Sequence, residues 1–144
     1  METAKNITEN AISNSSNPYI YAGHGCTLYR EQFERFIQKL NIPVMLSWRA
    51  IDLLPDDHPL FAGRPGLIAQ PEANKRLWDA DLVLILGARM DDSLTCYNRD
   101  GFCPKAKKIV VDIDKAELDR LPDDWIKICQ DVGEFMKEVD EVTE

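Results

Sequence analysis

Several features that would define the class of a protein are missing from this sequence of 144 residues. It has no run of 18 or more apolar residues, so it offers no candidate for a membrane-spanning helix. Residues 1–6 lack the apolar segment of a secretory signal, and we therefore expect a cytoplasmic protein. Basic residues are scarce as well: 17 lysines and arginines face 25 acidic residues, and the net charge of −8 argues against a nucleic-acid partner.

One basic cluster stands out, formed by Lys105, Lys107 and Lys108. It directly precedes an apolar run that has the character of a strand, and acidic residues surround it in the sequence. We interpret the cluster as a solvated entrance to that strand rather than as a phosphate-binding patch.

Cysteine is too sparse, and wrongly spaced, for a zinc site. The four cysteines form no C-x-x-C pair, and no histidine lies near Cys96 or Cys103 at zinc-finger spacing. A disulfide framework is not typical of an acidic domain of this size, so we expect the thiols to be reduced. Cys129 falls in an apolar run, where we expect it to pack as a small hydrophobic residue.

Only two histidines are present, His24 and His58. His58 follows two aspartates in residues 56–59 and resembles a catalytic dyad on paper, which would suggest a hydrolase. No serine or cysteine adjoins it, however, and the favoured interpretation is a loop histidine bonded to a neighbouring backbone group or carboxylate. His24 lies between two glycines, which is typical of a phosphate loop or a plain turn.

Hydrophobic spacing predicts alternating helices and strands. Helices are expected over the first dozen residues, from about residue 30 to 40, from 69 to 80, briefly from 115 to 121, and from 132 onward, where Asp131 is placed as an N-cap. Strands are expected at residues 19–22, 44–47, 82–86, 109–111 and 125–129. Residues 48–68 are rich in proline and glycine and are expected to form a long irregular loop.

This alternation predicts an α/β fold, a doubly wound parallel sheet with helices on both faces. Residues 82–86 are apolar throughout, as a central strand of such a sheet requires. We find no repeat or linker and expect one domain over residues 1–144, with residues 1–16 as a lead-in helix and turn.

The carboxyl ends of the strands are the natural place for a ligand in such a sheet. The residues that follow the five expected strands are Gly23-His24-Gly25, Ser47-Trp48-Arg49, Gly87-Ala88-Arg89, Asp112-Ile113-Asp114 and Gln130-Asp131-Val132. Glycines there let backbone N–H groups approach a phosphate, arginines can pair with phosphates, and Asp114 or Asp131 can accept from a ribose hydroxyl. Together they indicate a candidate nucleotide site.

Three more specific kinds of site are disfavoured. The segment from Gly23 reads G-x-G-x-x-L and lacks the third glycine of the NAD fingerprint, and no acidic residue ends the second strand. No G-K-S/T follows a glycine-rich loop, so there is no P-loop. Asp91 and Asp92 can bind a divalent metal in principle, but adjacent carboxylates are commonly just solvated, and we assign no metal site.

Three long segments resemble one known family. Residues 48–66 resemble the loop of the central domain of thiamine-diphosphate-dependent enzymes, residues 80–92 match its A-D-L-x-L-x-x-G-A-R-x-D-D segment, and residues 106–118 match its A-K-x-I-x-x-D-I-D-x-A-E-L segment. Their order and spacing agree, and the resemblance covers roughly residues 10 to 140. The sequence is most similar to acetolactate synthase-like proteins.

The resemblance implies a six-stranded, doubly wound domain that is not itself catalytic. In acetolactate synthase this domain holds the ADP part of FAD, a structural cofactor for the main reaction, and some family members bind ADP or have lost the nucleotide. Carried over by motif, the cofactor contacts would be Gly23, His24, Gly25, Ser47, Trp48, Arg49, Gly87, Ala88, Arg89, Asp91, Ile113 and Asp131. The parent enzyme would use thiamine diphosphate and magnesium to transfer an acyl or aldehyde unit from a 2-oxo acid.

Departures from the family pattern shape the functional hypothesis. His24 replaces a glycine of the family's usual triplet, and Ile68-Ala69 replaces a histidine-glycine pair, both of which disfavour a flavin. The catalytic glutamate and the G-D-G…N motif for thiamine diphosphate are missing. We therefore expect an inert central domain whose partners are the thiamine-binding domains of a parent enzyme. The alternative is a free-standing module that binds FAD or ADP.

Overall fold

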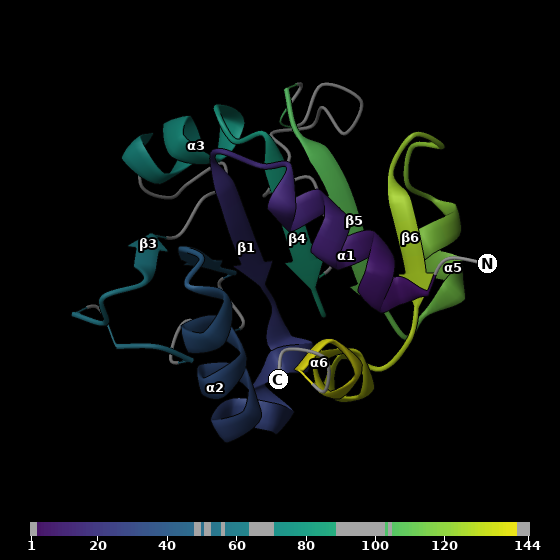
Figure 1. Cartoon of the computed structure of the whole chain (residues 1–144), viewed down its shortest axis with the longest axis horizontal. Coiled ribbons are helices and arrows are strands. Elements are labelled where there is room, and N and C mark those ends of the chain that lie inside the picture. Colours follow the sequence, from purple (N-terminus) through teal and green to yellow (C-terminus); the bar gives the residue numbers. More distant parts are fainter. Residues whose placement is uncertain are drawn as a thin grey trace.

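The computed structural model describes residues 3–47, 50, 53–55, 57–63, 71–88, 103 and 105–140. Its centre is a parallel sheet of six strands in the order β3-β2-β1-β4-β5-β6 (Figure 1). The strands are β1 Pro18–Ala22, β2 Val44–Leu46, β3 Phe61–Gly63, β4 Leu82–Leu86, β5 Lys107–Asp112 and β6 Ile126–Cys129. The predicted doubly wound α/β class is confirmed.

The helices follow from local sequence signals. They are α1 Ala4–Ser13, α2 Arg30–Leu40, α3 Pro71–Trp78, α5 Lys115–Asp119 and α6 Val132–Asp140, with a 3₁₀ turn, η1, at His24–Tyr29. Thr3 caps α1 by accepting from the N–H of Asn6, and Asp114 caps α5 by accepting from the N–H of Ala116. Asn41, in a left-handed conformation at φ +55°, ends α2.

Two hydrophobic layers cover the sheet. On one face, α1, α2 and α6 pack over β1, β2, β4 and β5 and lie in front of the sheet in Figure 1. Phe36 of α2 and Phe135 of α6 meet edge to face there, with ring centroids 6.3 Å apart. Leu77 of α3 and Leu118 of α5 belong to the layer on the opposite face. All five residues of β4 are buried, as its uninterrupted apolar run predicts.

Three expectations were wrong in detail. β3 lies inside the segment that was expected to be irregular, and it pairs with β2 at the edge of the sheet. Lys108 is not solvated: only 6% of it is exposed, and its ammonium lies 5.6 Å from the centre of the Trp125 ring. Cys129 is exposed, because β6 is an edge strand and Cys129 is its last residue.

Within the described residues, no helix combines the length and the apolar character that crossing a bilayer requires. The three described cysteines, Cys26, Cys103 and Cys129, are free thiols. Cys96 lies outside the described residues.

Candidate functional site

The order in which the chain adds strands to the sheet reverses between β1 and β4. The chain order runs outward from β1 to β3 on one side and from β4 to β6 on the other. Such a reversal creates the crevice where open α/β sheets bind ligands. The turns that follow β1 and β4 meet at this point, which is the edge where the sequence analysis placed its candidate nucleotide site.

The predicted glycines are used to bring two turns into backbone contact. A Cβ built on Gly23 would lie 2.4 Å from the Cα of Ala88, and one built on Gly25 would lie 3.1 Å from the Cα of Gly87. Gly87 itself has φ +60°, which suits glycine. Each of these three glycines is therefore needed where it stands for packing inside the protein.

Their amide groups are already paired. The N–H of Gly23 donates to the carbonyl of Leu86 at 2.9 Å, and that of Gly25 donates to the carbonyl of Gly87 at 3.1 Å. The N–H of Gly87 donates to the carbonyl of Val111 at 3.0 Å. A phosphate at this edge would have to compete with these bonds, so the three glycines do not form a ready cradle of free donors.

The other predicted residues at the edge differ in their exposure to solvent. His24 is exposed at the start of η1, and Ser47 is half-buried while its N–H donates to Ala22 at the end of β1. Ile113 follows β5 and is 72% exposed. Ala88 is buried against Gly23 and presents no polar group beyond its backbone.

The Asp131 carboxylate accepts hydrogen bonds from two different groups. Asp131 follows β6 and caps α6, as predicted, because its carboxylate accepts from the N–H of Glu134 at 3.3 Å. The hydroxyl of Tyr29, at the end of η1, also donates to this carboxylate, with distances of 2.9 and 3.1 Å to the two oxygens. That hydrogen bond, with smaller contributions from desolvation and the nearby negative charges, raises the pKa of Tyr29 above its ordinary value of 10.0.

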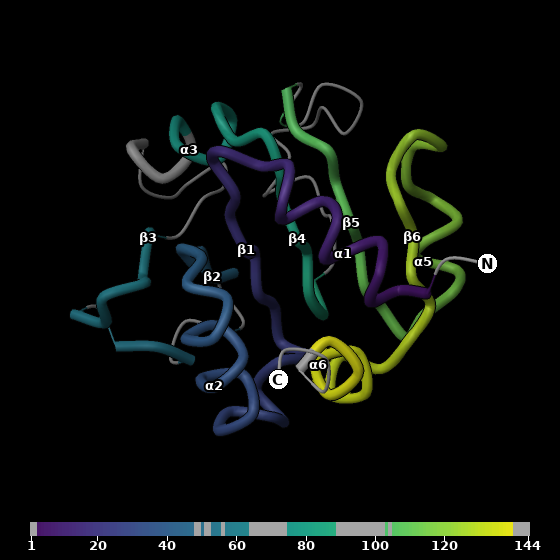
Figure 2. Tube along the Cα trace, in the orientation of Figure 1, coloured from purple at the N-terminus to yellow at the C-terminus, as the bar shows by residue number. Residues whose placement is uncertain are grey.

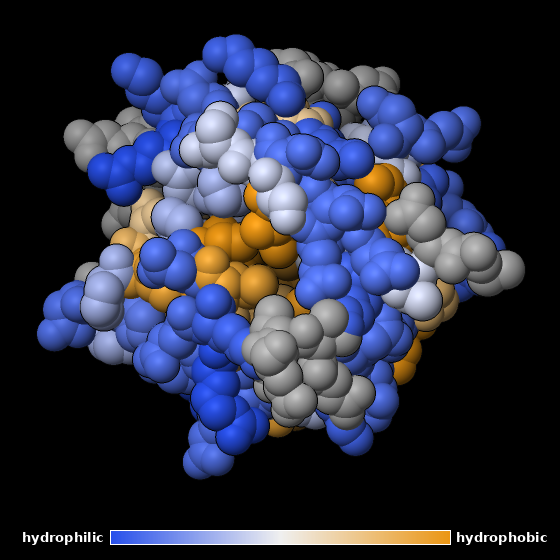
Figure 3. Space-filling view, viewed as in Figure 1, coloured by the Kyte–Doolittle hydropathy of each residue, from blue (hydrophilic) through white to orange (hydrophobic). Residues whose placement is uncertain are grey.

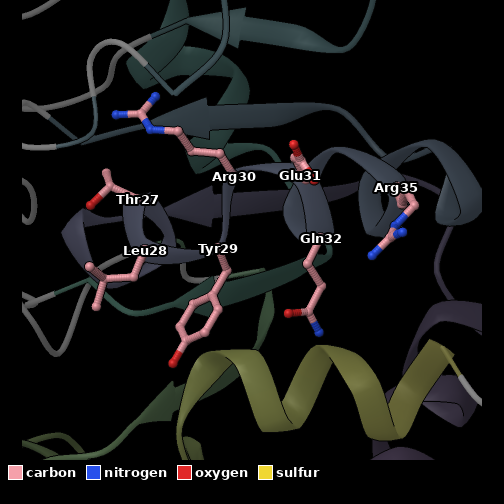
Figure 4. Close-up of a pocket in the computed structure, with 7 residues that line it drawn as sticks. All are labelled: Thr27, Leu28, Tyr29, Arg30, Glu31, Gln32 and Arg35. Carbon is pink, nitrogen blue, oxygen red and sulfur yellow. The ribbon is translucent and has the colours of Figure 1, made fainter.

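A second contact joins the same two segments. The side-chain amide of Gln32, in the first turn of α2, donates to the carbonyl of Gly133 at 2.8 Å. The Tyr29 ring lies against Gly133 so closely that a Cβ built there would be 2.6 Å from the ring. In Figure 4, Tyr29 and Gln32 both point toward α6. Figures 1 and 2 show the turn after β1 beside the start of α6.

Sequence reasoning missed Tyr29, Gln32 and Gly133. One signal was available: a glycine inside a helix lowers its stability and usually has a packing reason. Gly133 stands in the first turn of an otherwise well-patterned helix, and its partner is the Tyr29 ring.

Figure 4 shows the shallow cavity beside these residues, with a volume of about 360 Å³. It is lined by Thr27, Leu28, Tyr29, Arg30, Glu31, Gln32 and Arg35. Arg30 points away from α6, opposite to Tyr29 and Gln32, so the polar groups do not converge on one point.

The remaining predicted contacts, Trp48, Arg49, Arg89 and Asp91, lie outside the described residues. In the part of the chain that is described, no group of histidine, cysteine, aspartate and glutamate side chains is placed to hold a metal ion. Among the described edge residues, the amides of Gly23, Gly25 and Gly87 are paired within the protein, and the Asp131 carboxylate accepts from Tyr29 and Glu134.

Comparison with known proteins gives a consistent family. Residues 8–139 match the family model described as "Thiamine pyrophosphate enzyme, central domain". The chain is 33% identical over 128 residues to the acetolactate synthase isozyme 1 large subunit of Escherichia coli, covering 89% of this chain and 23% of that protein. It is 35% identical over 121 residues to acetolactate synthase 1 of Zea mays, covering 84% of this chain and 19% of that one. The chain thus spans about a fifth of the length of these relatives.

Proposed function

The chain belongs to the family of thiamine pyrophosphate enzyme central domains, and from this membership we propose that it serves as a non-catalytic scaffold in an acetolactate synthase-like enzyme. The observation that carries the proposal is the extent of the match. It covers residues 8–139, nearly the whole chain, while the chain spans only about a fifth of the length of the relatives. The chemistry of the assembled enzyme then belongs to domains beyond these residues.

The described residues support a structural role. Polar groups at the carboxyl edge form hydrogen bonds that hold the turns together. Three glycine amides donate to backbone carbonyls, and the Asp131 carboxylate accepts from the Tyr29 hydroxyl and from an amide at the start of α6. The sequence also has no G-D-G…N motif, which the family uses to bind the metal and the diphosphate of thiamine. We expect no turnover by this chain alone.

The surface supports contact with neighbouring domains. Leu28 and Ile113 are the large hydrophobic side chains that stand exposed among the described residues, at 77% and 72%. Both follow strands at the carboxyl edge. Figure 3 also shows hydrophobic side chains gathered in a hollow near the middle of the face that carries α1, α2 and α6. Apolar surface of this kind is typical of a face that another domain covers, and thiamine-binding domains are the proposed partners.

The reaction of the assembled enzyme is proposed from the relatives. By resemblance to acetolactate synthase, thiamine diphosphate held by the neighbouring domains would supply the carbon nucleophile for transfer of an acyl or aldehyde unit from a 2-oxo acid. This chain would contribute spacing and orientation of those domains. The acceptor would be selected by residues outside it.

The test is purification of the native polypeptide or assembly that carries this chain. We expect it to include thiamine-binding domains and to consume a 2-oxo acid only with thiamine diphosphate and magnesium. Residues 1–144 alone should show neither turnover nor thiamine diphosphate binding by calorimetry. Turnover by residues 1–144, or a native product of only these residues without a thiamine-binding partner, would refute the proposal.

The alternative is a free-standing module for FAD or ADP. The strand order favours it, because the crevice between β1 and β4 is the dinucleotide position of this fold. The engaged glycine amides and Asp131 oppose it. An absorbance spectrum of the purified chain and calorimetry with FAD, ADP and NAD distinguish the two, since no flavin band and no heat at millimolar ligand exclude the module.

A further inference from the structure

Two segments that lie far apart in the sequence are joined at the carboxyl edge. The first runs from the end of η1 into α2 and carries Tyr29 and Gln32, and the second is the start of α6. Tyr29 donates to Asp131, and Gln32 donates to the carbonyl of Gly133, across 102 and 101 residues of sequence. We call these four residues the Tyr29 clamp.

We infer that the Tyr29 clamp takes the place of an adenine nucleotide at this edge, so that a contact within the protein does the structural work expected of that cofactor. A cofactor with a structural role joins the turns at the ends of different strands. The clamp makes that junction between the turn after β1 and the turn after β6, using groups that the chain itself supplies.

The fit of the clamp leaves little room for a ligand at the same point. The ring covers Gly133 so closely that even a methyl group there would lie 2.6–2.9 Å from ring carbons. The N–H of Glu134 is taken by the Asp131 carboxylate, and the N–H of Phe135 donates to the Asp131 carbonyl at 2.9 Å. At the start of α6, the amides of Glu134 and Phe135 are therefore paired, and the Tyr29 ring covers Gly133.

The chemistry of the clamp favours a contact that holds without a cofactor. A phenol donating to a carboxylate is a charge-assisted hydrogen bond, which is stronger than a neutral one. Packing of the ring on a glycine adds apolar contact that a polar bond alone would not supply. The inference does not depend on the proposed scaffold role, because a nucleotide-free edge is equally compatible with other tasks for the domain.

The experiment has two arms. In the first, the purified chain is examined for flavin absorbance and for bound nucleotide after denaturation, then heated with and without 1 mM ADP or FAD. We expect no bound nucleotide and no rise in the unfolding temperature. A bound nucleotide, or a rise of several degrees, overturns the inference.

The second arm tests the clamp by a double-mutant cycle. Tyr29→Ser and Asp131→Ala should each lower the unfolding temperature by a few degrees, and the double variant should lose less than the sum. Tyr29→Phe keeps the ring on Gly133 and should lose less than Tyr29→Ser. Leu28→Ser, at the exposed neighbouring position, is the matched control and should change little. Additive losses would mean that the two residues do not act together and would overturn the clamp.

Discussion

His58 and Glu34 are joined by a hydrogen bond between Nε2 and Oε2 of 2.8 Å, which fastens the segment before β3 to α2. The other ring nitrogen, Nδ1, accepts from the N–H of Leu60 at 3.1 Å. A nitrogen that accepts carries no proton, so the hydrogen on the ring lies on Nε2 and points to the carboxylate. The histidine that resembled a catalytic base in the sequence is thus a loop residue bonded to a backbone group and a carboxylate, which was the favoured interpretation.

The first prediction concerns this pair. His58→Ala removes both bonds of the ring and should lower the free energy of unfolding by about 1–2 kcal/mol. Glu34→Ala should cost less, about 0.5–1 kcal/mol, because its side chain is 41% exposed. Urea denaturation of both variants and the double variant gives the coupling. A coupling energy of zero between His58 and Glu34 would contradict the proposed role of their hydrogen bond. Loss of a hydrolytic activity in His58→Ala would instead support the hydrolase hypothesis.

Gly23 and Gly25 give a graded test of the contact between the turns after β1 and β4. The Cβ of Gly23→Ala would lie 2.4 Å from the Cα of Ala88 and 2.6 Å from the carbonyl oxygen of Gly87, and both atoms belong to the backbone. We expect a loss of about 3 kcal/mol or failure to fold. Gly25→Ala meets its nearest atom at 3.1 Å and should cost about 1 kcal/mol. Equal effects in urea denaturation would show that close approach does not explain these glycines.

At the amino ends of the strands, hydrogen bonds to Asp81 connect the turn before β1 to the start of β4. Its carboxylate accepts from the hydroxyl of Ser15, from the N–H and hydroxyl of Ser16 at 2.8 and 3.0 Å, and from the N–H of Asn17 at 3.1 Å. These bonds, that from Ser15 foremost, lower the pKa of Asp81 from 3.8 to about 2.

The pH dependence follows from the lowered pKa. A group whose pKa is lower in the folded state stabilises the fold above its unfolded pKa, and the stabilisation is lost as pH falls from about 3.8 toward about 2. Asp81→Asn should therefore cost about 1–2 kcal/mol at neutral pH, and the difference from the unsubstituted chain should shrink over that acid range. Asp79→Asn is the matched control, since that exposed side chain pairs only weakly with Lys105, at 3.4 Å. A difference that persisted unchanged at pH 2 would contradict the assignment.

The sequence predicted the elements whose hydrophobic pattern is long and regular. The apolar run of β4 and the stripes of α2 and α6 are set by local residue order, so they lie where expected. β3 was not predicted because its three residues, in a segment rich in proline, carry no periodic hydrophobic signal. They form a strand only because they pair with β2.

The site was harder to predict than the fold. Topology brought the strand ends together, as expected for a parallel sheet, but local sequence does not reveal where a side chain finds its partner. Tyr29 meets Asp131 across 102 residues, and Lys108 is buried because Trp125 lies beside it. Such tertiary contacts decide whether a polar group at the edge is available to a ligand.

The last prediction concerns thiol reactivity. Burial raises the pKa of both Cys26 and Cys103 to about 12, so almost no thiolate exists at pH 8. Cys129 is exposed at the end of the edge strand β6. Iodoacetamide at pH 8 followed by peptide mass spectrometry should modify Cys129 within minutes and leave Cys26 and Cys103 unmodified until urea unfolds the chain. Cys129→Ser is the control that removes the modification expected at this position. If Cys26 reacted as fast as Cys129 in the folded chain, the buried contact of its thiol with the carbonyl of Leu86, at 3.4 Å, could not be the prevailing state.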